Sequence, residues 1–156
     1  MGQHLVLTVH LHDRFHGVAD GGSEWPPAPA RVFQALVAGA ARGRSLPEDK
    51  LAAFEWLESL PPPVISAPRA QLGTRMLLFV PNNDADSLSD PTDVGAIRTK
   101  KIVQPRIPAP GPLVYAWQIE ADPQGHAMRV VDAANDLYQL GRGIDLAWAS
   151  ADILED

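Results

Sequence analysis

The fold is decided by the stretch Glu24-Trp25-Pro26-Pro27-Ala28-Pro29-Ala30-Arg31-Val32-Phe33-Gln34-Ala35-Leu36-Val37-Ala38-Gly39. Three prolines within four positions stiffen its first part and remove three backbone donors. This part therefore forms neither a helix interior nor a central strand. An apolar pattern with helical spacing follows at once, with Val32 and Leu36 on one stripe. Because Pro29 suits the first turn of a helix, we expect a stiff entry segment and then a helix over residues 29–42.

The segments on either side show the periods of strands and helices. Residues 4–12 alternate, with Leu5 and Leu7 on one face and His10 and His12 on the other, which is typical of a half-buried strand. Further helices are expected at 47–59 and 126–140, and further strands at 64–67, 75–80, 113–120 and over Ile144, Leu146 and Trp148. Residues 81–112 show no periodicity, which favours a functional or mobile loop. The aromatic residues expected in the core are Trp56, Tyr115, Trp117 and Trp148.

This order of elements predicts the fold class. Without the helix at 47–59, the chain reads strand, helix, strand, strand, helix, strand. The sequence therefore predicts an α+β fold of the ferredoxin-like or RRM type (βαββαβ), with an extra helix. Both core helices are expected on one face of the sheet, which leaves the other face open.

The composition is typical of one cytoplasmic globular domain spanning residues 1–156. A chain of 156 residues with 46% apolar side chains is long enough to bury roughly two-thirds of its unfolded surface. The absence of cysteine excludes disulfides and thiolate metal sites, and it favours the cytosol. No apolar run approaches the roughly 20 residues that cross a bilayer, so no membrane association is predicted.

The net charge of −6 is unevenly distributed. Residues 61–112 carry six basic and four acidic side chains, whereas residues 113–156 carry two basic and eight acidic ones. Four cations and no carboxylate fall within residues 98–106. A local basic stripe on an acidic body suits a protein that grips a polyanion at one place and docks to protein elsewhere. The alternative is that this stripe is a solvated loop.

Several segments carry a family resemblance. Besides residues 24–39, these are Arg14-Phe15-His16-Gly17 after the first strand, residues 56–63, Pro81-Asn82-Asn83-Asp84, Arg98-Thr99-Lys100-Lys101 and Val114-Tyr115-Ala116-Trp117. Over about residues 4–118 the chain resembles the CRISPR-associated proteins of type I-U (I-G) systems in the RAMP superfamily. In that family a half that caps the 5′ handle of the guide RNA is joined to a guide-processing half. The resemblance implies the handle-capping half without the processing half, because family members are much longer.

This resemblance implies a function, a shape and a set of partners. The chain would be a non-catalytic crRNA-binding subunit of a Cascade ribonucleoprotein complex in antiviral defence. It would contact the guide RNA, the backbone and large subunits, and its own missing processing domain. A thumb-like insertion is expected at about residues 68–112, between the second and third core strands.

The same resemblance directs attention to eleven candidate RNA-binding residues. Cations can neutralise phosphates, and an arginine fork can hold two phosphate oxygens at once. Trp25 could stack on a base, although a tryptophan at this place is more often a hydrophobic staple for the helix start. The two asparagines could read the handle or simply close a turn. The full set is Arg98, Lys100, Lys101, Arg106, Arg69, Arg75, Arg14, His16, Trp25, Asn82 and Asn83.

Two other classes of function remain open at this point. His10, His12 or His16 could perform general acid–base cleavage of RNA without a metal, which would make the chain an endoribonuclease that processes precursor guide RNA. The alternative is that His10 and His12 lie on the open face of the sheet as partly solvated surface or interface residues. The acidic residues Asp84 to Asp93 lack the spacing of a cation loop, so neither a metal nor a cofactor is predicted. The net negative charge also permits a protein-only interaction module.

Overall fold

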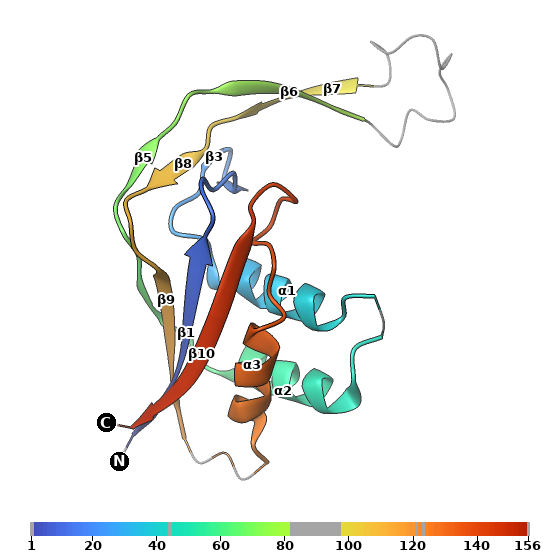
Figure 1. Ribbon diagram of the computed structural model, residues 1–156, viewed down its shortest axis with the longest axis vertical. Helices are drawn as coiled ribbons and strands as arrows, with labels where there is room; N and C mark the ends of the chain where they lie inside the picture. Colours follow the sequence, from blue (N-terminus) through green and yellow to red (C-terminus); the bar gives the residue numbers. More distant parts are fainter. Residues whose placement is uncertain (1, 44, 82–97, 121, 123, 156) are drawn as a thin grey trace.

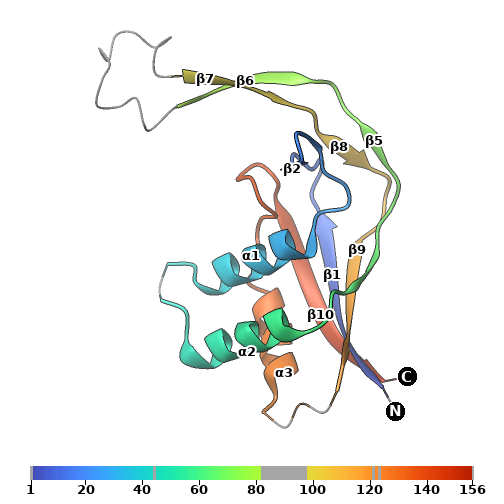
Figure 2. The same ribbon diagram turned by 180° about the vertical axis from the view of Figure 1, so that it is seen from behind.

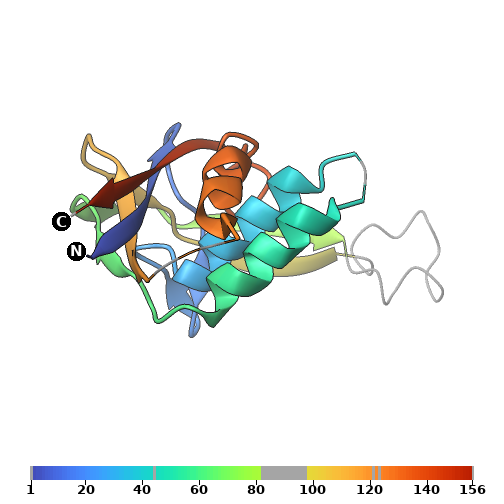
Figure 3. The ribbon, with the colours of Figure 1, turned by 90° about the horizontal axis from the view of Figure 1, so that it is seen from below.

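The computed structural model describes residues 2–155 except 44, 82–97, 121 and 123 (Figure 1). Its centre is an α+β unit built on a four-stranded sheet. The strands lie in the order β10 (Ala147–Glu155), β1 (Gln3–Leu11), β9 (Leu113–Ile119) and β4 (Val64–Ser66), and every neighbouring pair is antiparallel. The helices α1 (Pro29–Ala40), α2 (Glu48–Ser59) and α3 (His126–Ala134) pack together on one side of this sheet (Figure 3).

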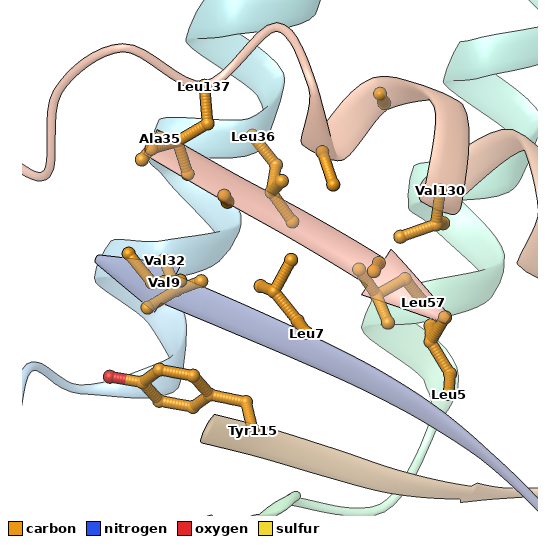
Figure 4. Packing of buried hydrophobic residues seen from close by; sticks show 14 of the residues in the cluster. Leu5, Leu7, Val9, Val32, Ala35, Leu36, Leu57, Tyr115, Val130 and Leu137 are labelled. Atoms are coloured by element: carbon orange, nitrogen blue, oxygen red, sulfur yellow. The ribbon is translucent and has the colours of Figure 1, made fainter. Parts of the chain in front are cut away.

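The core forms where the helices meet the sheet. Alternation along β1 buries Leu5, Leu7 and Val9, as the sequence predicts, and the same period in β9 buries Tyr115 and Trp117. In Figure 4, Leu7 and Val9 of β1 lie toward the apolar stripe of α1, whereas Leu5 lies near Leu57 of α2. This stripe includes Val32, Ala35 and Leu36, all buried. Because both elements are half-buried, their hydrophobic periods are visible in the sequence.

Polar contacts fix the stiff segment before α1. Glu24 is buried, and its carboxylate accepts a 2.6 Å hydrogen bond from the Ala28 amide and bonds from the Arg31 guanidinium at 2.6 and 2.9 Å. The buried Tyr115 hydroxyl donates to the Pro27 carbonyl at 2.7 Å. Pro29 occupies the first turn of α1, as predicted. The segment is therefore held to the sheet as well as stiffened by its prolines.

Two elements of the C-terminal third differ from the sequence-based expectation. The helix α3 ends at Ala134 and not at 140, because the amides of Asp136 and Leu137 bond three residues back and turn the chain onto α1. A side chain at Gly39 would lie 2.6 Å from the Asp136 carbonyl oxygen, so α1 and this turn are in close contact. Leu137 and Leu140 remain buried, which explains why the helical period seemed to continue.

The last strand was also expected too early and on the wrong face. The strand β10 begins at Ala147 and buries alanines at positions 147, 149 and 151. Ile144, Leu146 and Trp148 are 50–61% exposed, so Trp148 is not a core residue. Small residues fill the limited space beneath α3, and the large apolar side chains point the other way.

Between β4 and β9 the chain leaves the sheet as a long two-stranded ladder. β5 (Ala70–Leu72) pairs with β8 (Arg106–Pro108), and β6 (Met76–Pro81) pairs with β7 (Arg98–Val103). Figures 1 and 2 show this ladder arching away from the core. We call the described residues 70–81 and 98–108 the arm. The expectation that 81–112 lacks regular structure is wrong, because β7 and β8 lie within it.

A small hairpin lies close to β8, where the Arg106 guanidinium donates to the Ser23 carbonyl. Its strands are β2 (Val18–Ala19) and β3 (Gly22–Ser23), and its turn has positive φ at Asp20 (49°) and Gly21 (75°). Positive φ at both central positions defines a type I′ turn, for which Asp-Gly is a favoured pair. Among the residues that the structure describes, no helix has the length and apolar character needed to span a bilayer.

Candidate nucleic-acid interface

The arm gathers cations without any compensating carboxylate. It carries Arg75, Arg98, Lys100, Lys101 and Arg106, and Arg69 directly precedes it. The sequence has no Asp or Glu between Glu58 and Asp84 or between Asp93 and Glu120, so none lies in the described arm. The side chains of Arg98, Lys100 and Lys101 on β7 are exposed to solvent. A surface of this kind attracts phosphate groups.

The strand register divides the arm into two faces. Phe79 lies opposite Lys100, and Leu77 lies opposite Ile102, so these four residues share one face. Lys101 lies opposite Leu78 on the other face. The cations of β7 are therefore distributed over both sides of the ribbon.

Arg106 belongs to the base of the arm and not to its free surface. Its backbone exchanges two hydrogen bonds with that of Phe15, of 2.8 and 2.9 Å, and its guanidinium donates to the Ser23 carbonyl at 3.0 Å. The side chain is half-buried, and its Nε has no partner among the described residues. Arg106 thus joins the arm to the segment after β1 and to the β2–β3 hairpin.

Three other arginines stay accessible near the base. Arg75 is exposed, with a 3.4 Å contact from its Nε to Gln104 Oε1. Arg69 is exposed at the point where the chain leaves the sheet. Arg14 is also exposed and lies 3.5 Å from the carboxylate of its neighbour Asp13. These residues extend the basic surface from the arm toward the core.

His16 forms a buried pair that the sequence did not suggest. Its Nδ1 lies 2.6 Å from Asp145 Oδ1, and its backbone amide donates to both carboxylate oxygens at 3.0 and 3.2 Å. Asp145 is fully buried, and His16 is 8% exposed. Asp145 follows α3 in an irregular segment with no neighbouring motif, so only the three-dimensional structure brings the two residues together.

Trp25 packs as an anchor. Its indole Nε1 donates to the Pro68 carbonyl at 3.0 Å, and its ring lies 6.2 Å from that of Phe15 in a tilted arrangement. The side chain is half-buried and ties the segment before α1 to the start of the arm. Asn82 and Asn83 lie outside the described residues.

The other histidines of the first strand lie away from this cluster of contacts. His10 stacks on Trp148 with 3.9 Å between ring centroids and 8° between planes, on the face of the sheet opposite the helices. His12 is exposed. Within the described part of the chain, no three histidine or carboxylate side chains come close enough together to hold a metal ion.

Two pKa shifts mark groups that stabilise the fold. Burial, reinforced by the Glu24 carboxylate, raises the pKa of the Tyr115 hydroxyl above its ordinary value, so this group stays a hydrogen-bond donor. Partial burial opposes ionisation of Asp122. The hydrogen bonds from the Ala127 and His126 amides outweigh it, and the pKa of this carboxyl falls below its usual value. Asp122 Oδ2 accepts from the Ala127 amide at 2.7 Å and thereby satisfies the first turn of α3.

Comparison with known proteins assigns the chain to a family. Residues 7–144 match the family model of the CRISPR-associated protein, GSU0054 family. The chain belongs to this family. Membership supports a role in CRISPR defence. No curated protein sequence matches this family member.

One solved structure aligns with most of this chain. It is a crystal structure of a CRISPR protein from Archaeoglobus fulgidus, with 10% sequence identity and a TM-score of 0.43. The alignment covers 98% of this chain and 62% of that protein, so the family member described here spans less than two-thirds of its length.

Proposed function

We propose that this protein is a non-catalytic crRNA-binding subunit of a type I-U/I-G interference complex, corresponding to the handle-capping half of a RAMP protein. The arm grips the 5′ handle of the guide RNA, and the remaining surface abuts the backbone and large subunits and a processing domain. The acidic residues of the C-terminal third suit contacts with protein and not with RNA.

The arrangement of the core supports this proposal. The strand order β10–β1–β9–β4, with α1 and α3 following β1 and β9, agrees with a βαββαβ unit of the ferredoxin-like class. In that description α2 is an extra helix, and the arm is a thumb-like insertion between the second and third core strands. The insertion is longer than a hairpin turn needs, which is usual for functional loops.

One observation carries the proposal: the described arm projects from an acidic protein and bears only positive charge. Arg98, Lys100 and Lys101 are the primary RNA contacts, because they are exposed along one strand. Arg69, Arg75 and Arg14 continue this surface toward the core. Arg106, His16 and Trp25 act indirectly, because their polar groups hold the base of the arm. Asn82 and Asn83 remain candidates beside the described arm.

The test is retention of guide RNA by a charge-neutralised arm. The variant Arg98→Gln/Lys100→Gln/Lys101→Gln should lose most of its co-purifying RNA when expressed with the complete complex. The matched control is Arg42→Gln/Arg129→Gln/Arg142→Gln, which removes three cations outside the arm. If both variants keep the guide equally well, the chain is a protein-only module and the proposal is wrong.

The buried His16–Asp145 pair supports a second candidate, metal-independent cleavage of precursor guide RNA. A carboxylate bonded to Nδ1 fixes the orientation of an imidazole, as in many general bases. The purified chain should then cleave repeat RNA in EDTA, and His16→Ala should abolish the cleavage. Because only 8% of His16 is exposed, the structural role described above accounts for the pair more directly.

A further inference from the structure

One face of the distal arm combines large apolar side chains with cations. We call Leu77, Phe79, Arg98, Lys100 and Ile102 the Phe79 face, because the pairing of β6 with β7 places all five on the same side of the ribbon. Leu77 is 52%, Phe79 51% and Ile102 68% exposed. Scattered single apolar residues on a surface need no explanation, but a contiguous group on a projecting ribbon indicates a binding surface.

The apolar side chains on the opposite face of the same ribbon are more shielded, although Lys101 and Thr99 on that face are exposed. Met76, Leu78 and Val80 are half-buried, and Val103 is 1% exposed. The difference between the faces shows that the exposure of Phe79 is not simply a result of its position in a two-stranded ribbon. The arm therefore has an apolar-and-basic face that the described residues leave open to solvent.

We propose that the Phe79 face binds unstacked bases of single-stranded RNA, with the Phe79 ring as the stacking platform and Lys100 and Arg98 neutralising the adjacent phosphates. This inference rests on the proposed function and specifies how the arm would hold its RNA. An aromatic ring offers a surface to any base, and such stacking combined with a positively charged groove is the usual way to bind a single strand without reading its sequence.

Access to the ring favours a single strand over a duplex. In a duplex both faces of each base are stacked on neighbouring bases, so no face is free to lie against the Phe79 ring. An unpaired strand can turn its bases out of the stack and offer a free face to Phe79.

Charge favours RNA over a protein partner. Lys100 lies directly opposite Phe79, so any partner that covers the ring also covers or approaches the ammonium group. The centres of protein interfaces are depleted in lysine, because burial of the charge without a partner is costly. RNA supplies a base for the ring and a phosphate for the lysine at the same place.

The test measures the binding of the full chain to an oligouridylate of about 20 nucleotides carrying one 2-aminopurine, whose fluorescence falls on stacking. Phe79→Ala should weaken binding about tenfold, the equivalent of about 1.4 kcal/mol, while the dependence of affinity on salt stays unchanged. It should also reduce the fluorescence quenching on binding. Lys100→Gln should instead lower the slope of log affinity against log salt by about 0.7.

Matched variants separate stacking from general damage to the arm. Leu78→Ala removes an apolar side chain from the opposite face and should change affinity less than twofold, while Phe79→Tyr should retain both affinity and quenching. The inference is overturned if Phe79→Ala binds like the wild type, or if Leu78→Ala loses as much affinity as Phe79→Ala. Either result leaves the proposed function intact, which fails only if the triple glutamine variant of β7 binds RNA normally.

Discussion

Removal of the Asp145 carboxylate is expected to destabilise the fold more than any other single change considered. This side chain is fully buried, and both of its carboxylate oxygens accept hydrogen bonds from His16. In Asp145→Ala the His16 amide loses both of its acceptors, and Nδ1 of the ring loses its partner.

The magnitude follows from the bonds lost. A buried amide left without an acceptor costs about 1–3 kcal/mol, and a hydrogen bond to a charged group contributes about 1.5–3 kcal/mol. Their sum gives a loss of about 2.5–6 kcal/mol, which is a large part of the roughly 5–15 kcal/mol available to a domain. Asp145→Asn keeps one acceptor oxygen and should lose about 1–2 kcal/mol.

Urea denaturation followed by tryptophan fluorescence measures these changes. With a denaturant slope of about 2 kcal/mol/M, Asp145→Ala should lower the midpoint by about 2 M. Asp152→Ala is the matched control, because it removes an exposed carboxylate from β10 and should stay within about 0.5 kcal/mol of the wild type. An Asp145→Ala midpoint equal to that of the control would show that the buried pair contributes nothing and would refute the reasoning.

Three further predictions concern the sheet, a helix start and the arm. Tyr115→Phe leaves the Pro27 carbonyl without its donor and should lower the free energy of unfolding by about 1 kcal/mol in urea titrations, whereas an unchanged value contradicts the bond. The lowered pKa of Asp122 stabilises the fold at pH above its unfolded value of 3.8, and this contribution is lost as pH falls through the folded value. Asp122→Asn should therefore show less loss of stability than the wild type between pH 5 and about pH 3. Neutralising the three exposed cations of β7 should reduce the salt slope of RNA binding by about 2, measured by filter binding between 50 and 200 mM salt, and an unchanged slope would mean that they make no phosphate contact.

The half-buried elements were predictable from the sequence, because each has one face against the core. Leu5 and Leu7 in β1 and Val32 and Leu36 in α1 recur with the periods of a strand and a helix. The proline-rich segment before α1 was also predictable, because prolines lack the backbone N–H that a helix interior or a central strand needs. In the arm only β6 was predicted, as a strand over residues 75–80. The strand β7 gave no such signal, because Lys100 and Lys101 follow one another without alternation.

The misplaced and missed features have physical causes. Alanines in β10 give a weak hydrophobic pattern, and the larger Ile144, Leu146 and Trp148 therefore suggested the wrong strand face. The contact between His16 and Asp145 spans 129 positions, and no local pattern encodes it. The cations of β7 could be found from charge alone, whereas their division over two faces required the register of β6 with β7.

The reciprocal backbone bonds between Phe15 and Arg106 give the ladder a fixed root. Because these hydrogen bonds hold the base of the arm to the segment after β1, two distant parts of the sequence set the direction in which the arm projects. A graft of residues 70–108 onto another sheet would carry over the cations of the arm but not its orientation relative to the sheet. A graft that keeps the direction of the arm must therefore include residues 14–17 as well.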